Sequence, residues 1–227
     1  MKCKFGAIVV DGRNKIGGHV ASKNRAGSYF RTKVTPTNPG TTYQVNVRNR
    51  LAGLSSAWRA LTAGERTAWN ASVADFAKTD IFGDLRHPSG FNLHQMLNNN
   101  LLKINQNVIT TPPLPQAVEA FTSLSIAAAF AVPALDLTFA PAITANFFAY
   151  ISATPGLSPG ISFVKSEYRR ITVVDVGGVS PLDVKDAYVT KFGAIPAVGT
   201  KIFVRMVQIH KTTGQEGLPI QASCIVT

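Results

Sequence analysis

The pattern of hydrophobic and polar positions divides the chain into an extended beginning, a helical middle and an extended second half. Residues 4–10 are rich in β-forming side chains and end at Asp11-Gly12, a typical hairpin turn. Residues 16–22 are the expected return strand, although Gly17-Gly18 weakens it. Residues 28–34 alternate again, so the pattern predicts three strands within residues 1–40.

The last of these predicted strands has two distinct faces. Alternation places Tyr29, Arg31 and Lys33 on one face, opposite Phe30, Thr32 and Val34. We therefore expect a thin β-ribbon with one basic, aromatic face. It contains too few large apolar side chains to form a core alone, so we expect it to lie against something else.

An amphipathic helix is expected from residue 41 onward. Thr41-Thr42-Tyr43-Gln44 has the form of a capping box, with Thr41 as N-cap and Gln44 at N3. Apolar side chains then recur at spacings of 4, 4, 3 and 4. These residues form the expected core face: Tyr43, Val47, Leu51, Leu54 and Trp58.

A second capping box, Thr62-Ala63-Gly64-Glu65, predicts a shorter helix close behind the first. Its expected core face is Trp69, Val73 and Phe76. The short connection predicts an αα-hairpin, with both tryptophans near one core. A third helix is expected over residues 91–105, although the Asn98-Asn99-Asn100 run is unfavourable within it.

Residues 110–115, Thr-Thr-Pro-Pro-Leu-Pro, predict an extended connector because three prolines fall within four residues. We place the domain boundary there, after an arm (1–40) and a helical region (41–109) and before a domain formed by 116–227. In that last part, Pro and Gly separate short apolar segments: 135–139, 147–152, 168–174, 201–209 and 220–226. The spacing predicts an Ig-like or fibronectin-III-like β-sandwich, giving an α+β protein overall.

Composition adds a charge anomaly to this picture. The 227 residues include 23 Lys and Arg but 12 Asp and Glu, for a net charge of +11, and only 15% are charged. Nine of the excess positive charges fall within residues 1–50. The hydrophobic fraction of 45% argues against a disordered chain, and the longest apolar run, 126–135, is too short to span a bilayer. We expect no membrane association.

No arrangement of reactive side chains predicts catalysis. The two cysteines, Cys3 and Cys224, lie at opposite ends of the chain, and the four histidines are scattered. Gly17-Gly18 lacks the rest of a phosphate-binding loop, and Asp80-Ile-Phe-Gly-Asp84 is interpreted as a turn. The sequence therefore predicts neither an enzyme nor a bound metal or cofactor.

The basic arm is the strongest functional candidate. Its positive charge could bind a phosphate backbone, with Tyr29, Phe30 and Tyr43 stacking on single strands, or it could dock on an acidic protein surface in a large assembly. The chain beyond residue 50 is nearly neutral and no nucleic-acid-binding module is recognisable, which favours the protein partner. The expected anchoring residues are Lys4, Phe5, Arg13, Lys15, Lys23, Arg25, Tyr29, Phe30, Arg31, Lys33, Arg48 and Arg50.

Several stretches within residues 17–115 resemble the N-terminal region of an uncharacterised group of bacteriophage and prophage proteins. They are residues 22–44, then 58–69 (Trp-Arg-Ala-Leu-Thr-Ala-Gly-Glu-Arg-Thr-Ala-Trp), Gly83-Asp84 and Ser89-Gly90-Phe91-Asn92. The matching residues are Lys23, Asn24, Gly27, Tyr29, Arg31, Lys33, Pro36, Asn38, Pro39, Thr41, Gln44, Trp58, Arg59, Leu61, Thr62, Arg66 and Trp69.

The resemblance implies a phage setting and a structural role in the virion, without an activity to carry over. We therefore expect an auxiliary (decoration) or minor capsid protein, anchored by its arm to the acidic surface of capsid or neighbouring subunits and oligomeric within the assembly. The alternatives are a DNA-binding internal virion protein and a tail or connector adaptor.

Overall fold

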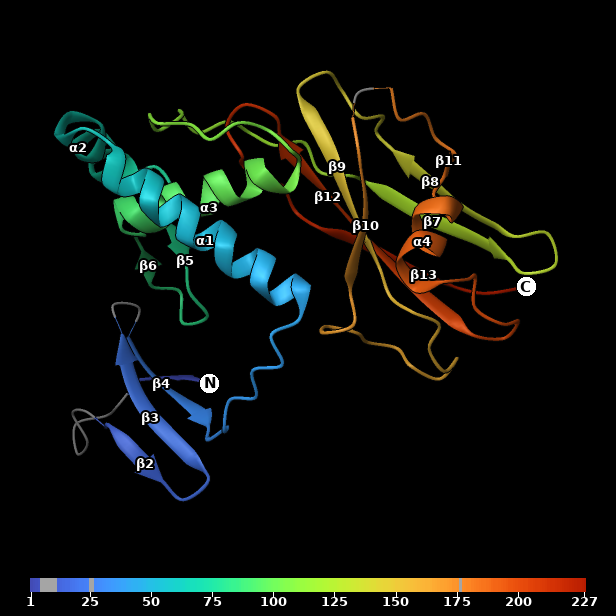
Figure 1. The fold of residues 1–227 in the computed structure, drawn as a ribbon, viewed down its shortest axis with the longest axis horizontal. Coiled ribbons are helices and arrows are strands. Elements are labelled where there is room, and N and C mark those ends of the chain that lie inside the picture. Colours follow the sequence, from blue (N-terminus) through green and yellow to red (C-terminus); the bar gives the residue numbers. More distant parts are fainter. Residues whose placement is uncertain (5–11, 25–26, 176) are drawn as a thin grey trace. The chain divides into compact units, whose positions relative to one another are not determined.

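The computed structural model describes residues 1–4, 12–24, 27–175 and 177–227 (Figure 1). It is a mixed structure, 24% helix and 31% strand, with antiparallel sheets, and it confirms the expected α+β class. Two compact units are formed, one by residues 1–49 with 77–87 and the other by residues 50–76 with 88–227. Residues 110–115 lie in the second unit without helix or strand, and a domain boundary there stays a prediction.

The first unit contains a four-stranded antiparallel sheet of order β1-β4-β3-β2. Its strands are β1 (Lys2–Cys3), β2 (Asn14–Ile16), β3 (His19–Asn24) and β4 (Gly27–Thr32). The expectation of one strand over 16–22 is wrong, because Gly17-Gly18 is the turn between β2 and β3, and Gly17 takes a positive φ of 57°. The expected strand at 5–10 and its turn at Asp11 lie outside the described residues.

Strand register defines the two faces of this sheet. Lys15, Val20 and Arg31 stand opposite one another across β2, β3 and β4. Tyr29 pairs with Lys2 on one side and Ser22 on the other. Because side chains alternate along a strand, all of these residues share one face, which we call the basic face. The expected common face of Tyr29 and Arg31 is confirmed.

A small hairpin, β5 (Lys78–Thr79) with β6 (Leu85–Arg86), completes the first unit. Asp80–Asp84 forms the connection, in which Asp80 N donates to Asp84 O and Gly83 N donates to Asp80 O. The interpretation of this segment as a turn is therefore confirmed.

Helix α1 (Thr42–Ala60) runs from the first unit into the second, and is followed by α2 (Ala63–Ala71), the short 3₁₀ turn η1 (Ser72–Ala74) and α3 (Gly90–Lys103). At α2 the capping box is complete: Glu65 N donates to Thr62 Oγ1, and Thr62 N donates to Glu65 Oε2. At α1 only one half is present, with Gln44 N donating to Thr41 Oγ1 at 3.4 Å.

The helical core lies where the end of α1 meets α2 and α3. Trp69 is fully buried in a cluster against which Trp58, Val73 and Phe76 pack, and Leu54 is also buried. The shared location of the two tryptophans is confirmed, since both rings contact His94 edge-on, with centroids 5.4 and 5.2 Å away.

The predicted core face of α1 is wrong in its first half. The exposed fractions of Tyr43, Val47 and Leu51 are 69%, 38% and 47%. The residues of α1 that are buried or bonded to α3 lie further along, at Leu54 and at Ser55, whose hydroxyl accepts from Gln95 Nε2 of α3. Periodicity shows which side of a helix is apolar but not how far along the helix a partner extends.

Two antiparallel sheets share the main core of the second unit. The three-stranded sheet has order β11-β8-β7 and the four-stranded sheet β10-β9-β12-β13. The elements are β7 (Ser123–Ala129), β8 (Ala134–Ala140), β9 (Phe147–Ala153), β10 (Arg169–Val174), β11 (Leu182–Asp183), α4 (Lys185–Phe192), β12 (Lys201–His210) and β13 (Ile220–Ile225). All five predicted segments correspond to strands, whereas β7, β11 and α4 were not expected.

The core is built from the inward positions of both sheets together with α4. Leu135 and Leu137 of β8 face Ile202, Val204 and Met206 of β12, and all are fully buried.

Among the described helices none is long and apolar enough to cross a membrane.

Candidate functional site

Nine of the twelve expected anchoring residues lie in the first unit, so the structure brings most of them into one compact part of the chain. They are Lys4, Arg13, Lys15, Lys23, Tyr29, Phe30, Arg31, Lys33 and Arg48. Arg50 belongs to the second unit, and its part in anchoring stays a prediction. Phe5 and Arg25 lie outside the described residues.

The basic charge of the first unit is concentrated and only partly neutralised. Its sequence holds eleven Lys and Arg against three Asp, a net of +8, whereas the second unit holds twelve against nine, a net of +3. Most of the chain's excess charge therefore belongs to a small sheet and hairpin.

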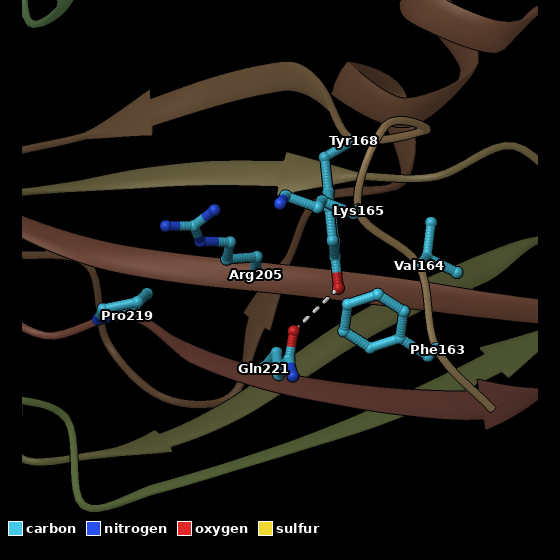
Figure 2. A pocket seen from close by; sticks show the side chains of 7 residues that line it. All are labelled: Phe163, Val164, Lys165, Tyr168, Arg205, Pro219 and Gln221. Carbon is cyan, nitrogen blue, oxygen red and sulfur yellow. Dashed lines mark hydrogen bonds between the residues drawn. The ribbon is translucent and has the colours of Figure 1, made fainter. Parts of the chain in front are cut away.

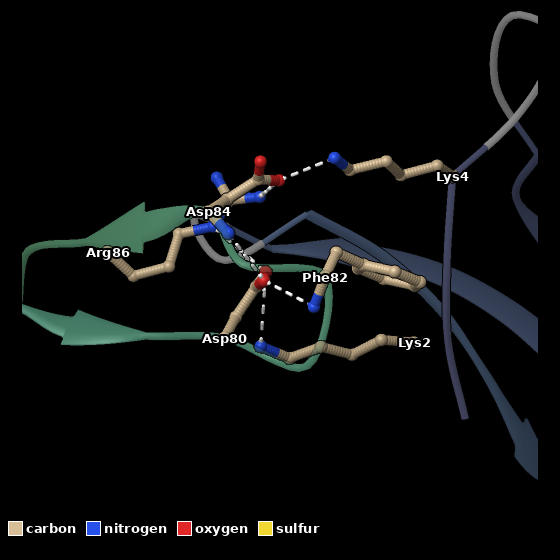
Figure 3. Close-up of polar contacts among 6 residues, drawn as sticks. All are labelled: Lys2, Lys4, Asp80, Phe82, Asp84 and Arg86. Carbon is tan, nitrogen blue, oxygen red and sulfur yellow. Dashed lines mark hydrogen bonds and ion pairs between the residues drawn. The ribbon is translucent and has the colours of Figure 1, made fainter.

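Two acids of the β5–β6 turn form an ion-pair cluster with the first strand (Figure 3). Lys4 Nζ lies 2.8 Å from Asp84 Oδ2, and Lys2 Nζ lies 3.8 Å from Asp80 Oδ2. Arg86 of β6 reaches both carboxylates at 3.3 Å. The sequence pattern did not predict this cluster, although two acids four residues apart in an acid-poor half of the chain were the available signal.

Asp80 is the structural centre of this cluster. Its side chain is 2% exposed, and Oδ1 accepts hydrogen bonds from the backbone N–H groups of Phe82 and Asp84 at 2.8 and 3.1 Å. Burial opposes ionisation, but these two donors, Arg86 and Lys2 outweigh it and hold the pKa of Asp80 below its usual value. The carboxylate therefore stays charged and keeps β1 beside the hairpin.

The basic face retains exposed cations that this cluster does not neutralise. Lys15 and Arg31 lie in one cross-strand row, and Lys33 follows β4, where its N–H continues the ladder to Gly18 O at 2.8 Å. All three side chains are exposed, and within the described chain none is at ion-pair distance from a carboxylate. This part of the face is available for an external anion.

The sheet has almost no core of its own. Across the described parts of β1–β4, Ala21 is the one buried side chain, at 3% exposure, while Tyr29 and Phe30 are half-buried. A four-stranded sheet of this size normally requires an apolar layer on one face. The sheet therefore combines a high positive charge with little buried apolar surface.

Among the residues that the structure describes, no group of three or more His, Cys, Asp or Glu side chains is placed to hold a metal ion. A comparison of the chain with protein-family models finds no match, and searches of curated proteins and of solved structures find none either.

Proposed function

We propose that this chain is a non-enzymatic structural component of a bacteriophage virion, an auxiliary (decoration) or minor capsid protein. In this proposal the basic face of the first unit binds an acidic surface on neighbouring virion subunits. The phage setting is supported by the resemblance carried by residues 22–44 and 58–69, and the mode of attachment is supported by the structure of the first unit.

The observation that carries the proposal is a strongly basic sheet with one buried side chain in its described strands. Such a sheet gains stability when a partner covers it. Exposed ion pairs contribute roughly 0–1 kcal/mol each, so Lys15, Arg31 and Lys33 alone would anchor weakly. Further burial of Tyr29, which lies on the same face, at about 25 cal/mol per Å² of apolar surface, would add to the attachment.

We further propose that the second unit contains a fibronectin-III-like sandwich that projects outward or makes lateral contacts. The strand order supports this arrangement: the first, second and fifth strands form one sheet, and the third, fourth, sixth and seventh form the other. Successive strands pair as hairpins at β7–β8, β9–β10 and β12–β13, as they do in that fold.

The test replaces charge on the basic face in the full chain. Lys15→Glu with Arg31→Glu should reduce incorporation into particles at least tenfold, measured by quantitative immunoblotting of purified virions. The matched control, Lys185→Glu with Lys191→Glu on α4, makes the same charge change in the second unit and should incorporate normally. Equal incorporation of both variants would refute attachment through the basic face.

An internal DNA-binding role is the second candidate, favoured by the row of Lys15 and Arg31 beside Tyr29. It predicts DNA binding by the full chain that weakens with salt, with a slope of about −0.9 per neutralised phosphate on logarithmic axes. Filter binding at two salt concentrations distinguishes the two candidates. A tail or connector adaptor would share the protein-binding behaviour, and its position in particle images would identify it.

A further inference from the structure

A groove crosses the outer face of the four-stranded sheet in the second unit, far from the basic face in sequence. Arg205 of β12 stands opposite Ser152 of β9 on one side and Gln221 of β13 on the other. Its neighbours Val204 and Met206 point into the core, so Arg205 points to the opposite face. The row continues to Arg170 of β10, which pairs with Ser152.

The groove consists of two adjoining hollows that share Tyr168 and Arg205, with volumes of about 340 and 260 Å³. Figure 2 shows the larger hollow, where the segment carrying Phe163, Val164 and Lys165 lies beside Arg205 and Gln221. The smaller hollow extends over Ser152 and Tyr150 toward Lys103 and Glu216.

The larger hollow has cations without a counter-charge. Arg205 is half-buried, and its guanidinium has no hydrogen bond or ion pair with any residue that the structure describes. Lys165 is exposed, and it too has no hydrogen bond or ion pair with a described residue. The nearby carboxylates are engaged elsewhere: Glu216 lies 3.9 Å from Lys103, and Glu167 accepts from Ser166. A half-buried guanidinium with five unmatched donors favours an anion, above all a carboxylate that it can bind bidentately.

The other lining groups suit a polyhydroxylated molecule. Tyr168 donates its hydroxyl to Gln221 Oε1 at 3.2 Å, which fixes the ring and leaves the amide N–H groups of Gln221 as donors. The Phe163 ring is 72% exposed at the same hollow and offers an apolar face. The hydroxyl of Ser152 has no partner within the described chain and can donate or accept.

We propose that this groove binds a carboxylate-bearing saccharide. The carboxylate pairs with Arg205 and Lys165, the sugar ring lies against Tyr168 and Phe163, and its hydroxyl groups bond to Gln221 and Ser152. The inference does not depend on the proposed virion role.

Two other anionic polymers fit the geometry less well. Nucleic acid binding gains from many cations along a track, whereas the second unit has a net charge of only +3. Extended peptides commonly add a strand to a sheet edge, but Arg205 lies on β12, whose backbone is paired on both sides, with β9 and β13. Acidic peptide motifs are bound by clusters of arginines, whereas the larger hollow is lined by one. A short acidic saccharide instead occupies an open hollow above the sheet.

The test is isothermal titration of the full chain with two matched pairs of probes, sialyllactose against lactose and trigalacturonate against galactotriose. At least one acidic probe should bind tenfold or more tightly than its neutral counterpart. Arg205→Gln and Lys165→Gln should each weaken that binding, the former at least tenfold, while Lys185→Gln on α4 should leave it unchanged.

Thermal melting followed by circular dichroism checks that Arg205→Gln folds, as expected for a side chain with no described hydrogen bond. Lys165→Gln, on an exposed segment, supplies a second variant whose folding is not in question. Binding that is equal for acidic and neutral probes, absent for all four, or unchanged in both variants would overturn the proposal. Tighter binding of a single-stranded oligonucleotide or of a polyglutamate peptide would also overturn it.

Discussion

Asn98 provides a sharp test of how the second unit is held together. Its side chain is fully buried on α3 and bonds to both backbone groups of Ile109: Ile109 N donates to Oδ1 at 2.7 Å, and Nδ2 donates to Ile109 O at 3.2 Å. Next to it, Trp69 Nε1 donates to Thr110 O at 2.6 Å. The segment after α3 is therefore fixed to the helical core by three side-chain hydrogen bonds.

The substitution Asn98→Ala removes two of these bonds at once. Leaving a buried polar group without its partner costs about 1–3 kcal/mol, and the half-buried position of Ile109 favours the lower part of that range. Alanine recovers about 0.5 kcal/mol through its higher helix propensity. With about 1–1.5 kcal/mol for each of the two backbone groups and this recovery subtracted, we expect the free energy of unfolding to fall by about 1.5–2.5 kcal/mol.

Urea unfolding of the full chain, followed by tryptophan fluorescence, measures this change. Both tryptophans of the protein, Trp58 and Trp69, belong to this cluster and report its unfolding. The matched control is Asn99→Ala, one position along the same helix, where no side-chain hydrogen bond to the described chain exists. It should change stability by less than about 0.5 kcal/mol, in the stabilising direction. Equal effects of the two substitutions would refute the argument.

Three further predictions concern buried groups of the second unit. Both amide atoms of Gln208 are buried without a described partner, so Gln208→Met should raise the free energy of unfolding by about 1 kcal/mol in urea, and a decrease would count against it. Gly214 has a φ of 68°, and a Cβ atom at this position would clash with the backbone carbonyl of Leu97. We therefore expect Gly214→Ala to lower the melting temperature by at least about 4 °C, and an unchanged melting temperature would contradict this close approach. Burial lowers the pKa of His94 below 6.5, so the unfolded chain takes up the proton first and stability should decrease as pH falls below about 6.5. Urea midpoints at pH 8 and pH 5 should differ less in His94→Phe than in the wild type, and an equal difference would rule out this linkage.

The third helix, predicted over residues 91–105, is confirmed as α3 (Gly90–Lys103), although it contains the unfavourable Asn98-Asn99-Asn100 run. Three asparagines in succession disfavour a helix by propensity alone. In the fold, Asn98 binds Ile109, and Asn100 donates to Gly214 O while accepting from Lys103. Two of the three residues therefore make tertiary hydrogen bonds to other segments, and a local sequence pattern does not reveal such bonds.

Elements with strong local signals were predictable, and those defined by distant partners were not. The Thr62–Glu65 capping box and the nearly continuous apolar run of β12 identified their elements directly. Strand β7 is rich in small residues and merges with β8 into one apolar run, so the turn between them was missed. The candidate surface was predicted in its charge, but the pairing of Lys2 and Lys4 with the acids of 80–84 required the folded chain.

Zero-length carbodiimide cross-linking of purified virions, read by mass spectrometry, tests whether the basic face binds another virion subunit. The reagent joins a lysine amine to a carboxylate in contact with it, so it reports the partner of the basic face. We predict that this chain is present in the virion and that Lys15 or Lys33 is joined to Asp or Glu of another virion subunit. Absence of the chain from purified virions, or its presence with both lysines unlinked while lysines of the second unit are linked, would contradict the account.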